Sequence, residues 1–289
     1  MSLNGQKERL AILLPVLNEG INLRIMLKIL RATVDVPHEV LVVCDSPDDD
    51  SIPVVEAMES EYPNARVVLN KLGRGVINAI RAGVAATEAE IILIFAADEV
   101  GPVLAVDDML TLIREGNEFV SCTRYAHGGR RLGGSAIGGV LSRTANRLFC
   151  RVGGSVLTDA TTGIKMFRRS LFEKLDLQSR PIGWACAFEM SIKAQLLGVR
   201  LGEVPIVSID RLYGGKSTFK PGPWTVEYLR WFAWGALRLH GAPHAAPAVR
   251  IPQSIDRHAL KVVAGARAPR KHDDAKKTPR EAAPSGATS

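Results

Sequence analysis

The sequence lacks long apolar runs and has few cysteines. No stretch reaches the roughly 18 consecutive apolar residues that a membrane-spanning helix needs. The first nine residues are polar and contain no apolar signal-peptide core. The four cysteines, at positions 44, 122, 150 and 186, have no metal-ligand spacing and do not indicate a disulfide framework. These absences predict a soluble protein of a reducing cytoplasm.

Most of the chain has no excess of positive charge. The formal net charge is +7, but residues 241–289 contribute +5 through nine Lys or Arg and four Asp or Glu. The preceding 240 residues are nearly balanced, which argues against a nucleic-acid-binding fold. Residues 241–289 contain no aromatic residue and are rich in Ala, Pro and Lys, so we expect a disordered basic tail.

The first half of the chain alternates short apolar runs with segments of helical spacing. This alternation predicts an α/β fold whose mostly parallel sheet is covered on both faces. Ligands bind at the carboxyl ends of such strands. The strands are expected at 10–16, 39–44, 66–69, 90–95 and 119–122, and the helices at 21–30, 51–60, 75–86 and 103–114. The segments after the strands are 15–19, 44–50, 71–75, 96–102 and 123–129.

The second half is less regular. We expect helices at 135–152, 187–197 and 223–240 and strands at 164–167 and 204–209. The polar segments after five strands would meet at one edge of the sheet. That convergence favours a ligand site there over a set of ordinary polar loops.

Carboxylates at two strand ends are candidate ligand contacts. Asp98 and Glu99 follow the fourth strand, where they could hold a divalent cation that bridges phosphate oxygens, or could simply be solvated. Asp45 follows the second strand and could accept hydrogen bonds from a nucleotide base or ribose. The acids at 48–50 are better explained by the positive end of the next helix.

Basic side chains are candidate phosphate ligands, because guanidinium groups hold phosphate oxygens in a fork geometry. Spacing alone does not choose among them. The candidates are Arg124, Arg143, Arg168, Arg211 and Lys216.

Ten short segments between residues 10 and 220 share their order with one known family. They are Pro15-Val16-Leu17-Asn18-Glu19, Val43-Cys44-Asp45-Ser46-Pro47-Asp48, Gly73-Arg74-Gly75, Ala97-Asp98 with Pro102, Thr123-Arg124-Tyr125, Ser142-Arg143 with Asn146, Asp159-Ala160-Thr161-Thr162-Gly163, Phe188-Glu189-Met190, Gly202-Glu203-Val204-Pro205-Ile206, and Asp210-Arg211 through Gly215-Lys216-Ser217. With them the chain resembles glycosyltransferase family 2, and within it the polyprenyl-phosphate (dolichyl-phosphate) mannosyl- and glucosyltransferases.

The resemblance implies a GT-A fold, a Rossmann-like domain that binds a nucleotide-diphosphate sugar, over residues 1–222. It also implies inverting transfer of a hexose from a GDP- or UDP-sugar to a polyprenyl phosphate at the cytoplasmic face of the membrane. The implied donor-pocket residues are Pro15, Asn18, Glu19, Asp45, Gly73, Gly75, Ala97 and Asp98. Arg124 and Arg143 would hold the acceptor phosphate, Arg211 and Lys216 would close over the diphosphate, and Glu189 would be a pocket carboxylate.

The metal motif departs from the family pattern. Ala96 stands where the family has the first Asp of its Asp-x-Asp motif, and Val100 replaces a polar residue. The implied Mg²⁺ or Mn²⁺ would therefore rest on Asp98 and Glu99.

Two other functions stay open. A phosphate acceptor is ionised at neutral pH and needs positioning, whereas a glycan or other hydroxyl acceptor would need a base such as Glu189 or Asp159. The altered metal motif also fits a catalytically weak homologue that binds nucleotide sugars.

The segment 223–240 combines arginines with many aromatic residues. Such a helix suits the lipid interface, and the basic tail would add attraction to anionic headgroups. We therefore expect peripheral contact with the inner face of the membrane. The alternative is that the aromatic side chains pack on the catalytic domain or on a second subunit of a homo-oligomer. They are Trp224, Tyr228, Trp231, Phe232 and Trp234.

Overall fold

The fold was analysed in a computed structural model of the chain. It describes residues 8–133, 136–209, 221–241, 245–253 and 255. Arg211 and Lys216, and most of the predicted tail, lie outside the described residues.

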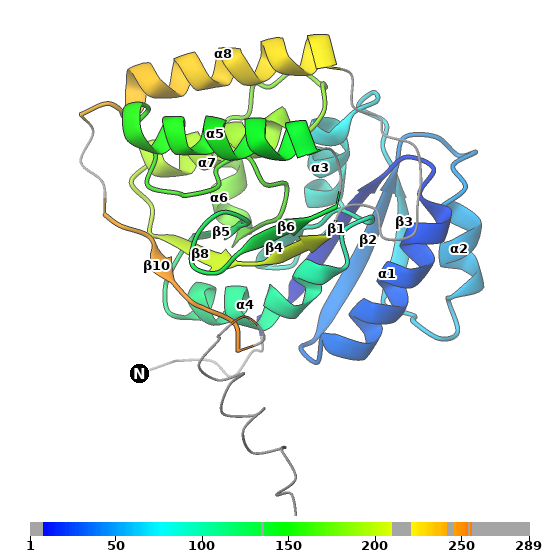
Figure 1. Cartoon of the computed structure of the whole chain (residues 1–289). Helices are drawn as coiled ribbons and strands as arrows, with labels where there is room; N and C mark the ends of the chain where they lie inside the picture. Colours follow the sequence, from blue (N-terminus) through cyan, green and yellow to red (C-terminus); the bar gives the residue numbers. More distant parts are fainter. Residues whose placement is uncertain (1–7, 134–135, 210–220, 242–244, 254, 256–289) are drawn as a thin grey trace, which may run out of the picture. The chain divides into compact units, whose positions relative to one another are not determined.

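An eight-stranded sheet forms the centre of the fold (Figure 1). Its strand order is β10-β8-β5-β7-β4-β1-β2-β3. All neighbouring strands are parallel except β7, which runs antiparallel to both β4 and β5. The strands are β1 (Leu10–Val16), β2 (His38–Cys44), β3 (Ala65–Leu69), β4 (Ile91–Ile94), β5 (Phe119–Thr123), β7 (Lys165–Arg168), β8 (Leu201–Pro205) and β10 (Ala248–Val249). A separate pair joins β6 (Arg130–Leu132) to β9 (Val207–Ile209).

Helices cover both faces of the sheet, because successive residues of the apolar strands point to opposite faces. Ile12 and Leu14 pack with α1 (Gly20–Thr33), α2 (Ile52–Ala57), the 3₁₀ helix η1 (Gly101–Ala105) and α4 (Val106–Arg114). Ala11 and Leu13 pack with α3 (Val76–Ala85), α6 (Arg169–Lys174) and α7 (Ala185–Leu196). The predicted α/β fold with its mostly parallel sheet is confirmed.

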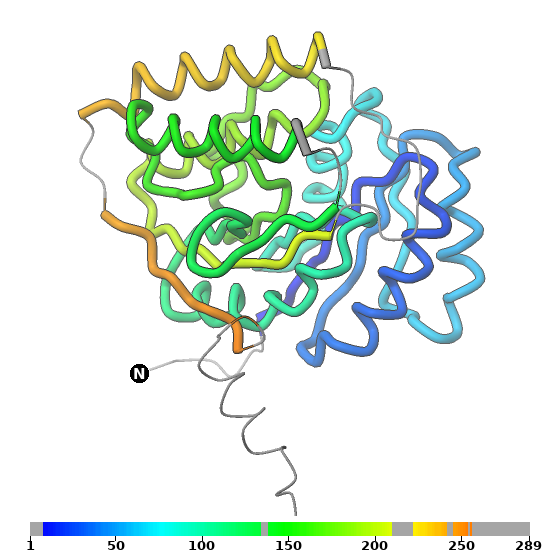
Figure 2. The backbone as a smooth tube through the Cα atoms, in the orientation of Figure 1, coloured from blue at the N-terminus to red at the C-terminus, as the bar shows by residue number. Residues whose placement is uncertain are grey.

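A third cluster joins α5 (Ala136–Val152), α7 and α8 (Pro221–Leu239). Phe149 of α5 and Phe188 of α7 are edge to face, and Trp231 of α8 is almost fully buried beside them. The tube in Figure 2 shows α5 and α8 lying side by side on the α7 side of the sheet. The expectation that the aromatic residues of α8 face lipid is therefore wrong for most of them. Tyr228, Phe232 and Trp234 pack against the same cluster.

Part of the segment predicted to be a disordered tail is ordered. Ala248 and Val249 pair with β8 as strand β10, and the Arg250 amide donates to the Glu203 carbonyl. The Arg250 side chain also pairs with Asp108 of α4 at 2.7 Å. The exposed edge of β8 supplies hydrogen-bonding groups that this short segment can pair with, although its sequence has no strand pattern.

Candidate active site

Five strand ends meet at one edge of the sheet, as predicted. β3, β2, β1 and β4 are mutually parallel, and β5 points the same way because β7 is antiparallel to both β4 and β5. Every candidate residue that follows β1 to β5 is thus placed at the carboxyl end of its strand. This is the edge where parallel α/β sheets bind ligands.

The loops after β1 and β2 are bound to each other. The amides of Asn18, Glu19 and Gly20 donate to Asp49 Oδ2, Ser51 Oγ and Asp50 Oδ1 at 3.0, 3.2 and 2.9 Å. Asn18 has a positive φ of 53°, a backbone conformation that Asn tolerates better than most residues. Asp49 and Asp50 therefore shape the loop that carries Asn18 and Glu19, a role that the sequence interpretation missed.

Asp45 is the centre of a second set of contacts, which we call the Asp45 knot: Asp45, Asn70, Gly73 and Gly75. Asp45 Oδ1 accepts from Asn70 Nδ2 at 2.7 Å, and Oδ2 accepts from the Gly75 amide at 2.9 Å. Asn70 Nδ2 also donates to the Gly73 carbonyl at 2.8 Å. Gly73 and Gly75 have φ values of 94° and 122°, which favour glycine. The structure thus brings together three of the predicted donor residues.

The acids after β4 lie on a tight turn. The Glu99 amide donates to the Ala96 carbonyl at 3.2 Å, Ala97 is buried, and Asp98 and Glu99 are half-buried. Among the described residues, no group of three or more His, Cys, Asp or Glu side chains is arranged to hold a metal ion. The acidic residues of this turn are Asp98 and Glu99.

Arg124 is locked against a buried carboxylate. Its Nε and Nη2 donate to Asp159 Oδ2 and Oδ1 at 2.7 and 3.0 Å, and Nη2 also reaches Thr161 Oγ1 at 3.3 Å. Burial alone would raise the pKa of the Asp159 carboxyl, but Arg124 and Lys165 together offset burial and lower it. The bidentate pair is therefore ionised, and it fixes the plane of the Arg124 guanidinium.

Arg143 and Arg124 share an aromatic neighbour, Tyr125. The guanidinium carbons of Arg124 and Arg143 are 5.1 and 5.4 Å from the centre of the Tyr125 ring. Tyr125 is itself anchored, since its hydroxyl donates to Ser142 Oγ on α5 at 2.9 Å. Arg143 is exposed, whereas only 12% of the Arg124 side chain is. The two predicted acceptor-phosphate ligands thus both contact Tyr125.

Glu189 has contacts that the sequence did not suggest. It is fully buried on α7, accepts from the amides of Gln178 and Ser179 at 2.6 and 2.7 Å, and pairs with Lys193 at 2.8 Å. Its catalytic role stays a prediction. Pro15 is half-buried near the end of β1, next to Val43 of β2.

Two buried charged residues, Lys165 and Glu203, lie near Asp159, the partner of Arg124. The sequence analysis did not identify them as a pair. Lys165 Nζ donates to Ser121 Oγ at 2.8 Å, and Glu203 accepts from the amide and hydroxyl of Thr158, both at 2.8 Å. Burial lowers the pKa of Lys165 to about 8 and raises the pKa of Glu203 to about 7. Charged residues inside otherwise apolar strands were the available sequence signal.

Glu203 leads to a prediction about stability and pH. Its folded-state pKa of about 7 exceeds its ordinary value of 4.5, so between these pH values the folded chain holds a proton that the unfolded chain releases. Glu203 therefore lowers the free energy of unfolding as pH rises through this window, by up to about 1.4 kcal/mol per unit. The free energy of unfolding, measured in urea at pH 5, 6, 7 and 8, should fall more steeply with pH for the wild type than for Glu203→Gln. Parallel curves would contradict the prediction.

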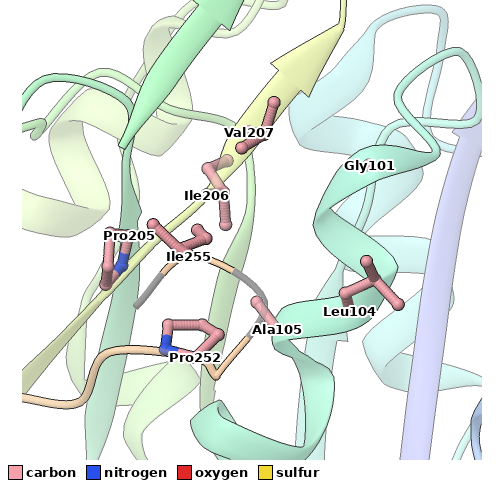
Figure 3. A pocket seen from close by; sticks show the side chains of 8 residues that line it. All are labelled: Gly101, Leu104, Ala105, Pro205, Ile206, Val207, Pro252 and Ile255. Carbon is pink, nitrogen blue, oxygen red and sulfur yellow. The ribbon is translucent and has the colours of Figure 1, made fainter. Parts of the chain in front are cut away.

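An apolar pocket lies beside η1. It has a volume of about 100 Å³ and contains none of the predicted site residues (Figure 3). Its lining comes from η1, the β8–β9 region and the ordered part of the tail: Gly101, Leu104, Ala105, Pro205, Ile206, Val207, Pro252 and Ile255.

Two curated proteins with related sequences are sugar transferases. The chain is 26% identical over 177 residues to dolichyl-phosphate beta-glucosyltransferase ALG5A of Trichomonas vaginalis, an alignment that covers 58% of this chain and 53% of that one. It is 27% identical over 175 residues to dolichyl-phosphate hexose transferase of Haloferax volcanii, covering 59% and 70%. The chain thus spans about half the length of the first relative.

Solved structures agree on the fold. Glucosyl-3-phosphoglycerate synthase from Mycobacterium tuberculosis, in complex with Mn²⁺, UDP-glucose and phosphoglyceric acid, superposes with a TM-score of 0.61 at 17% identity. The match covers 86% of this chain and 91% of that one. A complex of the same enzyme with Mg²⁺ and UDP gives 0.59, also at 17% identity and with coverage of 86% and 92%.

Family membership is shown by a profile that matches more than half of the chain. The glycosyl transferase family 2 profile matches residues 11–176, which run from the second residue of β1 to beyond the end of β7. These residues carry the loops after β1 and β2, the Asp45 knot, the acids after β4 and the Arg124–Asp159 pair. With its GT-A fold, the chain therefore belongs to glycosyl transferase family 2.

Proposed function

We propose that the protein transfers a hexose from a GDP- or UDP-sugar to a polyprenyl phosphate, with inversion at the anomeric carbon. The observation that carries the proposal is the pair Arg124 and Arg143 around Tyr125, at the sheet edge that also holds the Asp45 knot. The acceptors named for the two curated relatives support the same substrate class.

The two arginines suit a phosphate acceptor. A phosphate monoester has its second pKa near ~6, so it is already a nucleophile at neutral pH and needs no general base. Asp159 occupies Nε and Nη2 of Arg124, and no described residue accepts a hydrogen bond from Nη1. That edge, together with the exposed Arg143, can orient the phosphate. Attack from the face opposite the departing diphosphate inverts the anomeric carbon.

The leaving diphosphate gains charge as the sugar becomes oxocarbenium-like. A Mg²⁺ or Mn²⁺ ion would be held by Asp98, with Glu99 beside it, because one or two carboxylates plus substrate phosphates are a usual Mg²⁺ ligand set. When bound, the cation would neutralise charge on the diphosphate. Arg211 and Lys216 remain predicted to act on the same group.

Membrane contact is proposed for one surface, the α5–α8 face. Its apolar residues are aliphatic and exposed: Val140, Leu141, Leu148 and Val152 on α5, and Val226, Leu229 and Leu237 on α8. Its exposed charged residues are Arg143, Arg147, Arg151, Arg230 and Arg238. α5 has no acidic residue, and the single acid of α8, Glu227, is 1% exposed.

Exposed aliphatic residues mixed with arginines match a surface of anionic lipid. Arg143 belongs both to this face and to the phosphate ligands, so a lipid phosphate could reach the site from the membrane. Within the described residues no helix is long and apolar enough to cross a membrane.

The α5–α8 face gives a prediction about vesicle binding. The double variant Leu229→Glu/Leu237→Glu should bind phosphatidylglycerol-containing vesicles about tenfold more weakly, because two exposed apolar contacts are lost and negative charge is added. Co-sedimentation measures this. Leu104→Glu, which alters an exposed leucine of η1, is the matched control and should bind like the wild type. Equal binding by all three proteins would reject this face.

Incubation with labelled UDP- or GDP-hexose tests the reaction. With polyprenyl phosphate, the label should enter the organic phase, and NMR of the product should show the inverted anomer. Transfer to 3-phosphoglycerate alone would indicate a soluble phosphorylated acceptor. Absence of transfer to any acceptor would leave a protein that only binds nucleotide sugars and would overturn the proposal.

A further inference from the structure

Two buried carboxylates grip one loop beside the donor pocket. The loop, residues 178–184, is the last part of the connection from α6 to α7 and is called the 178–184 loop here. The amides of its first two residues donate to Glu189 Oε1 and Oε2 at 2.6 and 2.7 Å. The third amide, of Arg180, donates to Glu227 Oε1 of α8 at 3.2 Å. Three consecutive amides are thus held by carboxylates from two helices.

Both carboxylates are enclosed, with side chains 0% and 2% exposed for Glu189 and Glu227. A buried carboxylate is costly unless charged partners and hydrogen bonds compensate it. Glu189 has Lys193, and Glu227 Oε1 also accepts from Arg230 Nη1 and Trp231 Nε1 at 3.0 and 3.2 Å. These partners keep the two acceptors in place for the loop amides.

The 178–184 loop is in close contact with the Asp45 knot. A Cβ added to Gly75 would lie 2.6 Å from Pro181 Cβ and 2.9 Å from its carbonyl oxygen, so the two backbones are in close contact. The amide of Gly75 donates to Asp45. Arg81, on the helix that starts after Gly75, donates to the Leu177 carbonyl at 2.6 Å. The loop therefore touches the knot, and Leu177, the residue just before the loop, is bonded to the first helix beyond the knot.

We propose that Glu189 and Glu227 are positioning residues of the donor pocket, which hold the 178–184 loop against Gly75 and so fix the Asp45 knot for the nucleotide diphosphate. The inference rests on the donor half of the proposed function and is independent of the acceptor. It gives Glu189 a role other than the general base that the sequence left open.

The two carboxylates differ in what glutamine can replace. Glu189 uses both oxygens for loop amides, so in Glu189→Gln an NH₂ group opposes one amide donor. Glu227 uses Oε1 for its three hydrogen bonds, so Glu227→Gln can keep them whereas Glu227→Ala cannot. We expect Glu189→Gln and Glu227→Ala to be impaired and Glu227→Gln to resemble the wild type. Glu173→Gln, an exposed acid of α6, is the control.

The first measurement is calorimetric binding of UDP and of GDP well below the unfolding temperature. Kd for the nucleotide that the wild type binds should rise about tenfold in Glu189→Gln and Glu227→Ala. Binding of citronellyl phosphate, a short prenyl phosphate, should change less than twofold, roughly the scatter of such a comparison. Equal weakening of both ligands would indicate general loosening and overturn the proposal, as would unchanged nucleotide binding.

The second measurement needs no ligand. Amide hydrogen exchange in residues 72–78 should accelerate in the two impaired variants and stay unchanged in Glu227→Gln and Glu173→Gln. If the wild type binds neither UDP nor GDP, the proposed function fails, and exchange in this segment alone decides the positioning role. If Glu189→Gln does not fold, Glu227→Ala against Glu227→Gln remains the deciding pair.

Discussion

Replacement of Arg124 by lysine is expected to reduce kcat/KM for polyprenyl phosphate about 100-fold, because small errors in the placement of a reacting group cost that much. Lysine keeps a positive charge beside buried Asp159, so the fold should survive. It cannot reproduce the two parallel hydrogen bonds that set the guanidinium plane. Alanine is a poorer test, since it would leave Asp159 as an unpaired buried charge.

The role of Arg124 is decided by comparing its effect on acceptor turnover with its effect on donor binding. Kd for UDP or GDP should change less than about twofold in Arg124→Lys. Arg147→Lys, on the exposed side of α5, is the matched control and should leave both quantities unchanged. Donor binding that falls as far as acceptor turnover would place Arg124 on the diphosphate instead.

The sheet and its binding edge were predictable because they depend on local patterns. Continuous apolar runs such as 10–16 and 39–44 have few alternatives to a buried parallel strand, and parallel strands share a carboxyl edge. Convergence of the segments after β1 to β5 therefore followed from the order of elements alone.

The contacts inside the site were not predictable in this way. Asn18 meets Asp49 and Arg124 meets Asp159 across 31 and 35 residues of sequence, and no periodicity links such partners. The family resemblance indicated that these segments matter but not which side chains pair. Glu189 illustrates the difference, since its buried contacts with two loop amides differ from those expected of a pocket carboxylate.

The sequence also could not predict which side of α8 faces the protein. The charged residues Glu227, Arg230 and Arg238 share a sector of the helix with Trp234, so the pattern alone favours no orientation. In the structure the Glu227 carboxylate faces inward, where it accepts hydrogen bonds from the Arg180 amide and from Trp231 Nε1. The aromatic side of α8 therefore also faces inward. The side left outside is aliphatic and basic, which keeps the membrane proposal but changes the residues that carry it.

The last prediction concerns the altered metal motif. Asp98→Asn should lower transfer about 10²- to 10³-fold, the range seen when one charge-stabilising group is lost, while thermal unfolding stays near that of the wild type. Asp48→Asn, an exposed strand-end acid, is the matched control and should be nearly neutral. Ala96→Asp restores the missing acid and should lower the Mn²⁺ concentration needed for half-maximal UDP or GDP binding. Near-normal transfer by Asp98→Asn, or no change in Mn²⁺ dependence with Ala96→Asp, would mean that basic side chains, and not a cation at Asp98, neutralise the diphosphate.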